Sequence, residues 1–298
     1  MTLLAVPNYS EGRDPGVIAE LRSELDKDRG VLDRHSDTEH NRTVFTVAGD
    51  GRDLADLLAS SAEVALRRID MSRHRGLHPC IGALDVCPLV WLSEEGREKA
   101  TAQARAVAEG IAALGVPVFL YGELASSDER RERAFFREGG IDALRGRMGA
   151  GELMPDLGPA APHPTGGATL VTARPPLAAF NVELDRPDAA IAQRVAARVR
   201  ESGGGLPGVR AIGLPLEGRS QVSTNIGDPI AVPLREVVAK VAELAASEGA
   251  RPVEAEIVGL IPQAALIGFP PGLPIRAFDP DRHVIERRVG GGRRSSSR

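Results

Sequence analysis

Residues 43–47 read Thr-Val-Phe-Thr-Val, and this run of β-branched and aromatic side chains is typical of a β-strand. On both sides of it, short apolar runs alternate with stretches whose apolar residues recur at helical spacing. The flanking elements are a strand at 3–6, a helix with Ile18, Leu21 and Leu25, a strand at 31–32, a helix with Leu54, Leu58, Ala65 and Ile69, and a strand at 81–86. Residues 3–87 therefore predict strand, helix, strand, strand, helix, strand, which is the split βαβ order of ferredoxin-like folds.

The same order of six elements is predicted again after Pro175-Pro176. Strands at 177–184, 209–216, 220–226 and 254–260 alternate with helices that carry Ile191, Val195 and Val199, and Leu234, Val237, Val241 and Leu244. Between the two sets lie a helix at 104–114, a strand at 116–121 and a charged helical stretch around 128–137, which we expect to extend the first sheet. The predicted fold class is α/β (α+β), with two ferredoxin-like-derived subdomains.

Length and composition agree with an ordinary globular protein of two domains, since the chain has 298 residues, 42% of them hydrophobic and 26% charged. A net charge of −4 provides no global attraction for nucleic acid or an anionic membrane, so neither is expected as a partner. No leader and no membrane-spanning stretch is recognised, which favours a cytoplasmic location. Cys80 and Cys87 match no disulfide framework or zinc pattern, and we expect two free thiols.

A proline- and glycine-rich stretch separates the two predicted halves. Residues 149–176 hold six prolines and five glycines, which is typical either of a linker or of a long binding loop. We expect an N-terminal subdomain at 1–176, a C-terminal subdomain at 177–289 and a disordered tail of glycine, serine and arginine at 290–298.

The densest polar cluster is Ser72-Arg73-His74-Arg75-Gly76-Leu77-His78-Pro79, between a predicted helix and a predicted strand. Two histidines four residues apart suggest a metal pair on a helix, but Gly76 and Pro79 disfavour a helix through both. Basic side chains here could also stabilise the carboxyl end of the preceding helix, where they complement its dipole. That interpretation explains Arg73 or His74 better than His78. His78, before a proline at a strand entrance, is the better candidate for a catalytic group on a loop.

Further polar candidates surround the ends of the predicted strands. Asp85 is a carboxylate in an apolar strand and needs a partner, either a histidine that it orients or an arginine with which it pairs. Asn8, Ser10 and Glu11 follow the first strand, and Arg42 opens the third. Residues of these types are common in turns, which would explain them without a functional role. In a split βαβ fold, however, the exit of the first strand and the entrance of the third lie near the same edge, so they could also form a polar site there.

Several motifs along the chain match a known family. They are Val6-Pro7-Asn8-Tyr9-Ser10-Glu11-Gly12, Asn41-Arg42-Thr43-Val44, Ile69 to Pro79, Gly82 to Pro88, Val118 to Glu123, Pro155 to Pro159, Ala179-Phe180-Asn181 and Gln221 to Asn225. Together they resemble the glutamate formiminotransferase family. The resemblance runs to about residue 289. It implies two α/β subdomains whose sheets, mixed or antiparallel, face each other with the helices outside.

The resemblance also implies an activity and a set of site residues. His78 is the implied catalytic acid–base residue, and Asp85 is added as a residue that steers it. The implied folate and substrate contacts are Asn8, Ser10, Glu11, Arg42, Arg73, Gly158, Pro159, Ala160, Ala161, Pro162, His163, Pro164, Thr165, Gly166 and Gly167. The co-substrate is a tetrahydrofolate derivative, the other substrate is glutamate, no metal is required, and a homodimer is expected.

The expected reaction is transfer of a formimino group from 5-formiminotetrahydrofolate to glutamate, a step of histidine catabolism and one-carbon metabolism. Two alternatives stay open at this point. One is transfer of a formyl group from 5-formyltetrahydrofolate to glutamate, and the other is a folate-binding protein without turnover.

Overall fold

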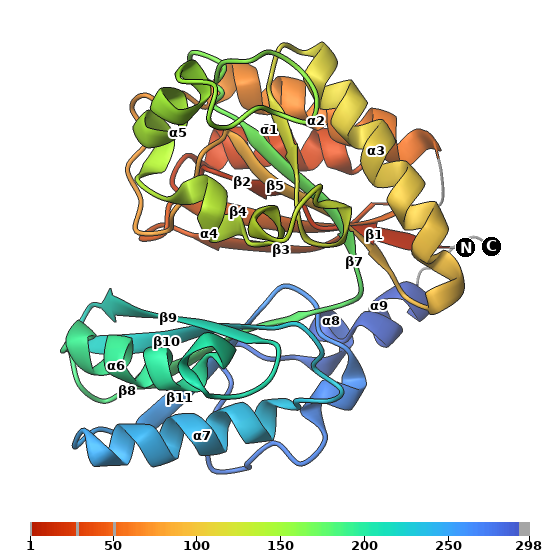
Figure 1. The fold of residues 1–298 in the computed structure, drawn as a ribbon. Helices are drawn as coiled ribbons and strands as arrows, with labels where there is room; N and C mark the ends of the chain where they lie inside the picture. The colour runs from red at the N-terminus through yellow and green to blue at the C-terminus, as the bar shows by residue number, and fades with distance from the viewer. Residues whose placement is uncertain (1, 28–29, 50–51, 292–298) are drawn as a thin grey trace. The chain divides into compact units, whose positions relative to one another are not determined.

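The computed structural model describes residues 2–27, 30–49 and 52–291. The chain forms two compact units, Met1–Pro175 and Pro176–Arg298 (Figure 1). Most of the tail predicted to be disordered, from residue 292 onward, lies outside the described residues, while residues 290 and 291 end a helix.

The first unit contains the six predicted elements in the predicted order. They are β1 (Leu3–Ala5) with its continuation β2 (Asn8–Tyr9), α1 (Pro15–Leu25), β3 (Val31–Asp37), β4 (Arg42–Gly49), α2 (Arg52–Arg68) and β5 (Leu84–Trp91). β4 pairs with β3 on one side and with β1 and β2 on the other, and β1 and β2 also pair with β5, always antiparallel. This is a split βαβ sheet, which confirms the predicted fold class.

Further strands extend this sheet on the β5 side. β7 (Thr169–Arg174) pairs parallel with β5, and β6 (Val118–Leu120) pairs parallel with β7. The proline- and glycine-rich stretch therefore includes a strand that the composition did not predict. β7 is paired on both edges, and five of its six residues are buried. The remaining α-helices described in this unit are α3 (Arg97–Ala113), α4 (Arg133–Arg137) and α5 (Gly140–Gly149).

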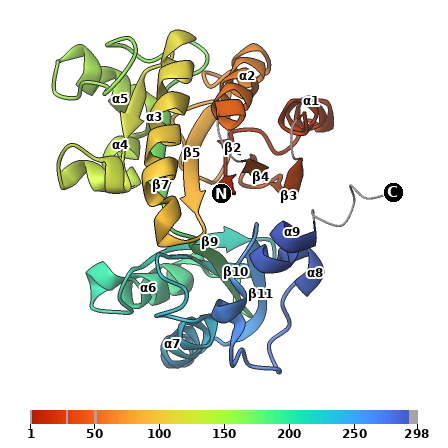
Figure 2. The ribbon, with the colours of Figure 1, turned by 90° about the vertical axis from the view of Figure 1, so that its right-hand side faces the viewer.

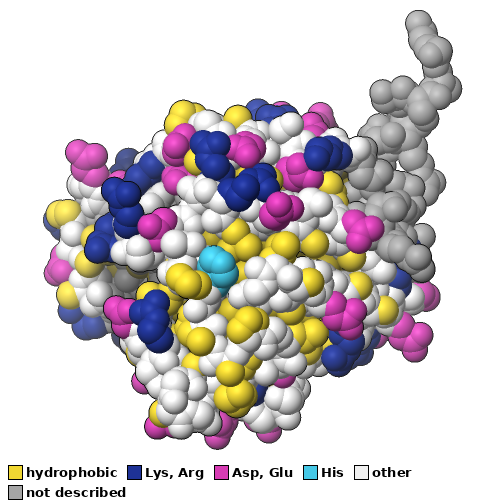
Figure 3. Space-filling model, turned by 90° about the horizontal axis from the view of Figure 1, so that it is seen from above, with side chains coloured by type: hydrophobic (Ala, Val, Ile, Leu, Met, Phe, Trp, Pro, Cys, Tyr) yellow, Lys and Arg dark blue, Asp and Glu magenta, His cyan; other side chains and the backbone are white. Residues whose placement is uncertain are grey.

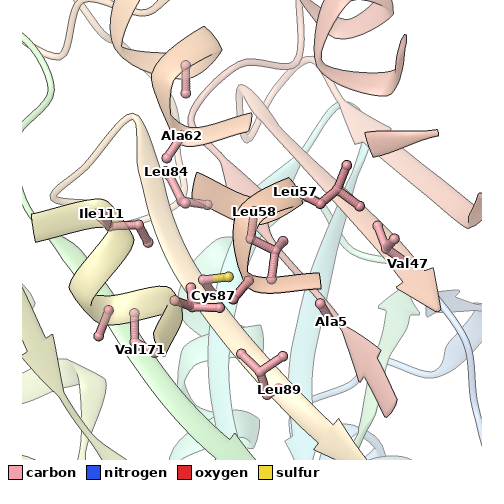
Figure 4. Packing of buried hydrophobic residues seen from close by; sticks show 14 of the residues in the cluster. Ala5, Val47, Leu57, Leu58, Ala62, Leu84, Cys87, Leu89, Ile111 and Val171 are labelled. Carbon is pink, nitrogen blue, oxygen red and sulfur yellow. The ribbon is translucent and has the colours of Figure 1, made fainter. Parts of the chain in front are cut away.

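Helices cover both faces of the extended sheet. Figure 2 shows α1, α2 and α3 side by side along one face, and their apolar residues share one core with the strands. Figure 4 shows the centre of that core, where Leu58 of α2, Ile111 of α3 and Cys87 of β5 converge. A second core contains Phe136 of α4 and Leu144 of α5 together with strand residues such as Val86. Since Val86 and Cys87 belong to different cores, α4 and α5 pack on the opposite face of the sheet.

The second unit repeats the six-element order. It contains β8 (Ala178–Leu184), α6 (Ala189–Val199), β9 (Val209–Leu216), β10 (Arg219–Ile226), α7 (Leu234–Ser247) and β11 (Pro252–Val258), followed by the short helices α8 (Pro280–His283) and α9 (Ile285–Gly291). Its antiparallel sheet has the order β11-β8-β10-β9. The fourth, first, third and second strands are therefore neighbours in both units, which confirms the predicted repeat.

Both cysteines are free thiols, as expected, and burial in the core raises the pKa of Cys87 to about 12. None of the helices in the described ranges is both long and apolar enough to span a bilayer.

Candidate functional site

His78 lies in the irregular segment that joins α2 to β5. The segment turns on Asp70, whose carboxylate accepts hydrogen bonds from the backbone N–H and the hydroxyl of Ser72, at 3.0 and 2.7 Å. Residues 74–83 contain no helix, so His74 and His78 do not form a helical metal pair. The side chain of His74 instead contacts the carbonyl of Asn41 (3.1 Å) and the thiol of Cys80 (3.6 Å).

The turn between β3 and β4 is joined to this segment. Asn41 has a φ of 49°, a left-handed conformation that asparagine tolerates better than most residues. Its side-chain amide donates to the carbonyl of Arg75 (3.0 Å), and its side-chain carbonyl accepts from the N–H of Gly12 (2.9 Å). The N–H of Leu77 donates to the carbonyl of Glu39. Asn41 thereby connects three loops at one edge of the sheet.

Asp85 projects from an irregularity in β5. Asn8 pairs with Val86 and Tyr9 pairs with Leu84, so Asp85 is one extra residue between two regular pairs, a β-bulge. Such bulges re-aim side chains. The Asp85 carboxylate is fully buried and accepts hydrogen bonds from Arg42 (2.9 Å), Arg137 (2.5 Å) and the N–H of Ile81 (2.9 Å).

Asp85 therefore pairs with arginines, the second of the two alternatives, and its described contacts include no histidine. Burial raises the pKa of its carboxyl, but the positive charges of Arg137 and Arg42 outweigh that effect and hold the pKa below its ordinary value. Arg42 also donates to the side-chain carbonyl of Asn8 (2.7 Å). The structure thus brings the predicted residues Asn8, Arg42 and Asp85 together in one hydrogen-bonded cluster.

Other predicted contacts have different surroundings. The hydroxyl of Ser10 is buried and donates to the carbonyl of Gly82 (2.7 Å), which holds the first strand against the entrance of β5. The Glu11 carboxylate accepts from the N–H groups of Arg13 and Asp14, so it stabilises the turn before α1. Arg73 is exposed, and its backbone N–H donates to the carbonyl of Asp70.

His78 is partly buried, and its Nδ1 atom is buried without a hydrogen-bond partner among the described residues. Its ring and that of His40 form a T-shaped, edge-to-face contact, with ring centroids 6.2 Å apart. Burial, then the positive charges of Arg42, Arg137 and Arg133, lower the pKa of His78 well below 6.5. His78 is therefore neutral near pH 7 and able to accept a proton.

The segment Gly158–Gly167 is a folded loop held against the entrance of β5. The carbonyl of Thr165 accepts from the N–H of Met71 (2.7 Å), and the carbonyl of Gly166 accepts from the N–H of Ala83 (2.9 Å). His163 closes the loop internally, since its Nδ1 accepts from the N–H of Gly166. A Cβ atom on Gly82 would lie 2.0 Å from the carbonyl oxygen of Ala168, so only glycine permits this approach.

The loop therefore lies beside residues 71–83, the segment that carries His78. The five remaining positions, Pro159, Ala160, Ala161, Pro162 and Pro164, belong to the same loop.

Two site residues were missed by sequence reasoning, Arg137 and His40. Arg137 was part of a charged stretch predicted only as helical, and no sequence pattern connects it to a carboxylate 52 residues away. His40 precedes the Asn41-Arg42 motif, and its proximity to His78 depends on how the β3–β4 turn folds onto the α2–β5 segment.

The site provides no evident metal centre, because the described ranges contain no group of three histidine, cysteine, aspartate or glutamate side chains placed to hold a metal ion. Figure 3 shows a face whose centre is largely hydrophobic, with basic and acidic side chains intermixed above this centre and toward the edges. The concentrated positive charge of Arg42 and Arg137 is buried instead.

The chain is similar in sequence to formiminotransferases over nearly its full length. The family profile of the formiminotransferase domain, N-terminal subdomain, matches residues 2–174, and that of the formiminotransferase domain matches residues 179–269. A glutamate formimidoyltransferase of Streptococcus pyogenes serotype M1 is 36% identical over 292 residues, which cover 96% of this chain and 98% of the relative.

Two further relatives come from an archaeon and a bird. A glutamate formimidoyltransferase of Thermoplasma acidophilum is 33% identical over 292 residues, which cover 95% of this chain and 96% of the relative. A formimidoyltransferase-cyclodeaminase of Gallus gallus is 37% identical over 88% of this chain but only 50% of its own length.

Proposed function

This chain belongs to the formiminotransferase family, and on that premise we propose that it is a glutamate formimidoyltransferase, a one-carbon transferase that moves a formimino group between 5-formiminotetrahydrofolate and L-glutamate. The observation that carries the proposal is the full-length similarity to proteins of that name, in a chain whose candidate base, His78, is neutral near pH 7.

We assign the proton transfers to His78. The α-amine of glutamate loses a proton to a neutral imidazole as its nitrogen forms a bond to the formimino carbon. The same proton then passes to N5 of the folate as the bond between that nitrogen and the carbon breaks, so His78 ends the cycle neutral. A histidine whose pKa lies below neutrality accepts the proton only briefly and returns it readily, which suits a residue that acts first as base and then as acid.

The Asp85 cluster supplies positive charge for a substrate carboxylate. Arg42 and Arg137 carry two positive charges against the single charge of Asp85, so one is uncompensated within the cluster. The Nε atom of Arg137 is buried without a hydrogen-bond partner in the described chain. Arginine is well suited to carboxylates, and we propose that this guanidinium binds a carboxylate of glutamate or of the folate tail.

The loop Gly158–Gly167 is our candidate for the folate contact. Its hydrogen bonds to Met71 and Ala83 hold it beside the segment of His78, and His163 provides the only ring in it that can stack on a pterin. Asn8, Ser10 and Glu11 are proposed to shape the same site from the first strand, and Arg73 to contact the substrate from the surface.

We further propose that the protein acts in histidine catabolism, in the cytoplasm and as a homodimer. Light scattering of the purified chain tests the last point, since a monomer at micromolar concentration would contradict it.

The function is tested by supplying purified protein with glutamate and either 5-formiminotetrahydrofolate or 5-formyltetrahydrofolate. We expect N-formiminoglutamate from the first donor, and the variant His78→Asn serves as the matched control. Product from the formyl donor alone would replace the formimino assignment, whereas folate binding without product from either donor would indicate a binding protein.

A further inference from the structure

Two imidazole rings from separate parts of the sequence lie next to each other in the first unit, and each has an unused nitrogen. His40 belongs to the β3–β4 turn and His78 to the α2–β5 segment, and their rings meet edge to face at 68° with centroids 6.2 Å apart. Nε2 of His40 and Nδ1 of His78 are both buried, and neither has a hydrogen-bond partner in the part of the chain that is described. Buried polar atoms are normally paired, so two unpaired nitrogens in adjacent rings call for an explanation.

Asp37 contacts both the backbone and the ring of His40. One carboxylate oxygen of Asp37 accepts from the backbone N–H of His40 at 2.7 Å, and the other lies 3.4 Å from Nδ1 of the ring. This leaves the opposite nitrogen, Nε2, as the free end of the ring. An aspartate behind one nitrogen selects the tautomer and the orientation of a histidine.

The backbone around His40 is joined to the segment of His78 in two ways. The N–H of Leu77 donates to the carbonyl of Glu39 at 3.2 Å. Gly76 lies so close to the carbonyl of His40 that a Cβ atom there would be 2.3 Å from its oxygen. The closeness of the two rings is therefore built into the backbone and does not depend on the rotamers of two flexible side chains.

We propose that His40, itself held in place by Asp37, is a positioning residue for His78 and fixes the orientation of the His78 ring through their edge-to-face contact. The inference deepens the proposed formimino transfer and rests on it for its catalytic meaning. It names a residue that acts through His78, and His40 itself is assigned no contact with substrate.

The charges that face His78 all act in the same direction. Arg42 of β4, Arg137 and Arg133 of α4, and His40 of the β3–β4 turn each lower the pKa of His78, after the larger effect of burial. Of the acidic residues already described, Asp85 pairs with Arg42 and Arg137, and Asp37 lies next to His40. Removing the imidazole of His40 therefore raises the pKa of His78. The rise is limited, because burial and the charges of the three arginines still lower that pKa.

The test uses His40→Asn, which keeps a polar group near Asp37, and His40→Gln, which keeps one near the position of Nε2. Glu39→Gln is the matched control, because it removes an exposed charge from the same turn while the backbone carbonyl that binds Leu77 remains. Thermal unfolding first establishes that the variants are folded. The titration of His78 is then followed by NMR in the protein without substrate, and kcat/KM for formimino transfer is measured against pH.

We expect the titration of His78 and the acid limb of kcat/KM to move to higher pH in both His40 variants and to stay in place in Glu39→Gln. We also expect kcat to fall by roughly 10- to 100-fold, the range that a small displacement of a reacting group costs, with KM little changed. A purely structural role would lower stability without moving either titration. Wild-type titration behaviour in folded His40 variants would overturn the proposal.

The two proposals can fail separately. If the wild-type protein transfers no formimino group while His40→Asn still shifts the titration of His78, the coupling between the rings stands and the proposed function is wrong.

Discussion

Replacing Asp85 with asparagine tests whether the buried cluster stabilises the first unit as its geometry indicates. The carboxylate is fully buried, and Arg42 and Arg137 are nearly so, with side chains 9% and 10% exposed. An asparagine fits the same space but leaves both guanidinium groups without a counter-charge. Breaking a buried ion pair by removing one partner costs about 3–5 kcal/mol.

That loss is a large part of the total stability of a domain, which is about 5–15 kcal/mol. At roughly 2–4 °C per kcal/mol for a domain of this size, we expect the midpoint of thermal unfolding to fall by about 6–20 °C. Asp142→Asn is the matched control, because Asp142 is 89% exposed and pairs with Arg145 at the surface. It should change stability by no more than about 0.5 kcal/mol.

Trp91 provides a local probe, since it is the only tryptophan of the chain and lies buried in β5, the strand that carries Asp85. Urea unfolding followed by its fluorescence reports on the first unit. The variant Asp85→Asn/Arg137→Met should recover part of the lost stability, because it removes one of the two uncompensated charges.

The pH dependence gives an independent check. Because the pKa of Asp85 is lowered from 3.8 in the folded protein, its contribution is fully present above 3.8 and is lost as the pH falls through the folded-state value. The free energies of unfolding of wild type and Asp85→Asn should therefore differ by the same amount at pH 7 and pH 5, and should converge only in stronger acid. A loss below about 1 kcal/mol at pH 7, similar to that of the Asp142 control, would refute the reasoning.

Three further predictions concern the site and its loop. His78→Asn should lower kcat by about 100-fold or more while folate still protects the variant against thermal unfolding. In the wild-type protein the acid limb of kcat/KM should lie below pH 6.5, since the pKa of His78 is lowered. An unchanged rate in the variant would remove His78 from the mechanism. Gly82→Ala should lower the free energy of unfolding by about 1–3 kcal/mol and weaken folate binding, because the new methyl group would displace the carbonyl of Ala168. Gly146→Ala, which places its methyl group in open space, should reduce neither stability nor folate binding. His163→Ala should raise KM for the folate more than it lowers kcat, and steady-state kinetics at varied folate would expose the opposite pattern.

Local patterns predicted most of the elements. The six-element order of each unit follows from apolar spacing and β-branched runs, because a strand or helix that buries one face must present apolar residues at period 2 or 3.6. β7 was not predicted because it lies inside a stretch rich in proline and glycine, and because its side chains are buried on both faces of the sheet and so show no alternation of polar and apolar residues. The position of His78 in a loop before β5 was also predicted, since Gly76 and Pro79 exclude a helix there.

The partners of these residues could not be predicted in the same way. Asp85 was recognised as a buried charge in need of a partner, but only the bulge in β5 and the packing of α4 on the sheet bring Arg137 to it. His40 reaches His78 because the β3–β4 turn is hydrogen-bonded to the α2–β5 segment.

The sequence by itself therefore determined the repeated split βαβ order, the family and the identity of the candidate base, because periodicity and motifs are properties of residues close together in the chain. Only the tertiary structure decided that Asp85 pairs with two arginines, that His40 lies against His78 and that the proline- and glycine-rich stretch is a docked loop followed by a strand. Electrostatic pairing depends on distance in space, and residues far apart in the sequence acquire that distance only when the sheet has formed.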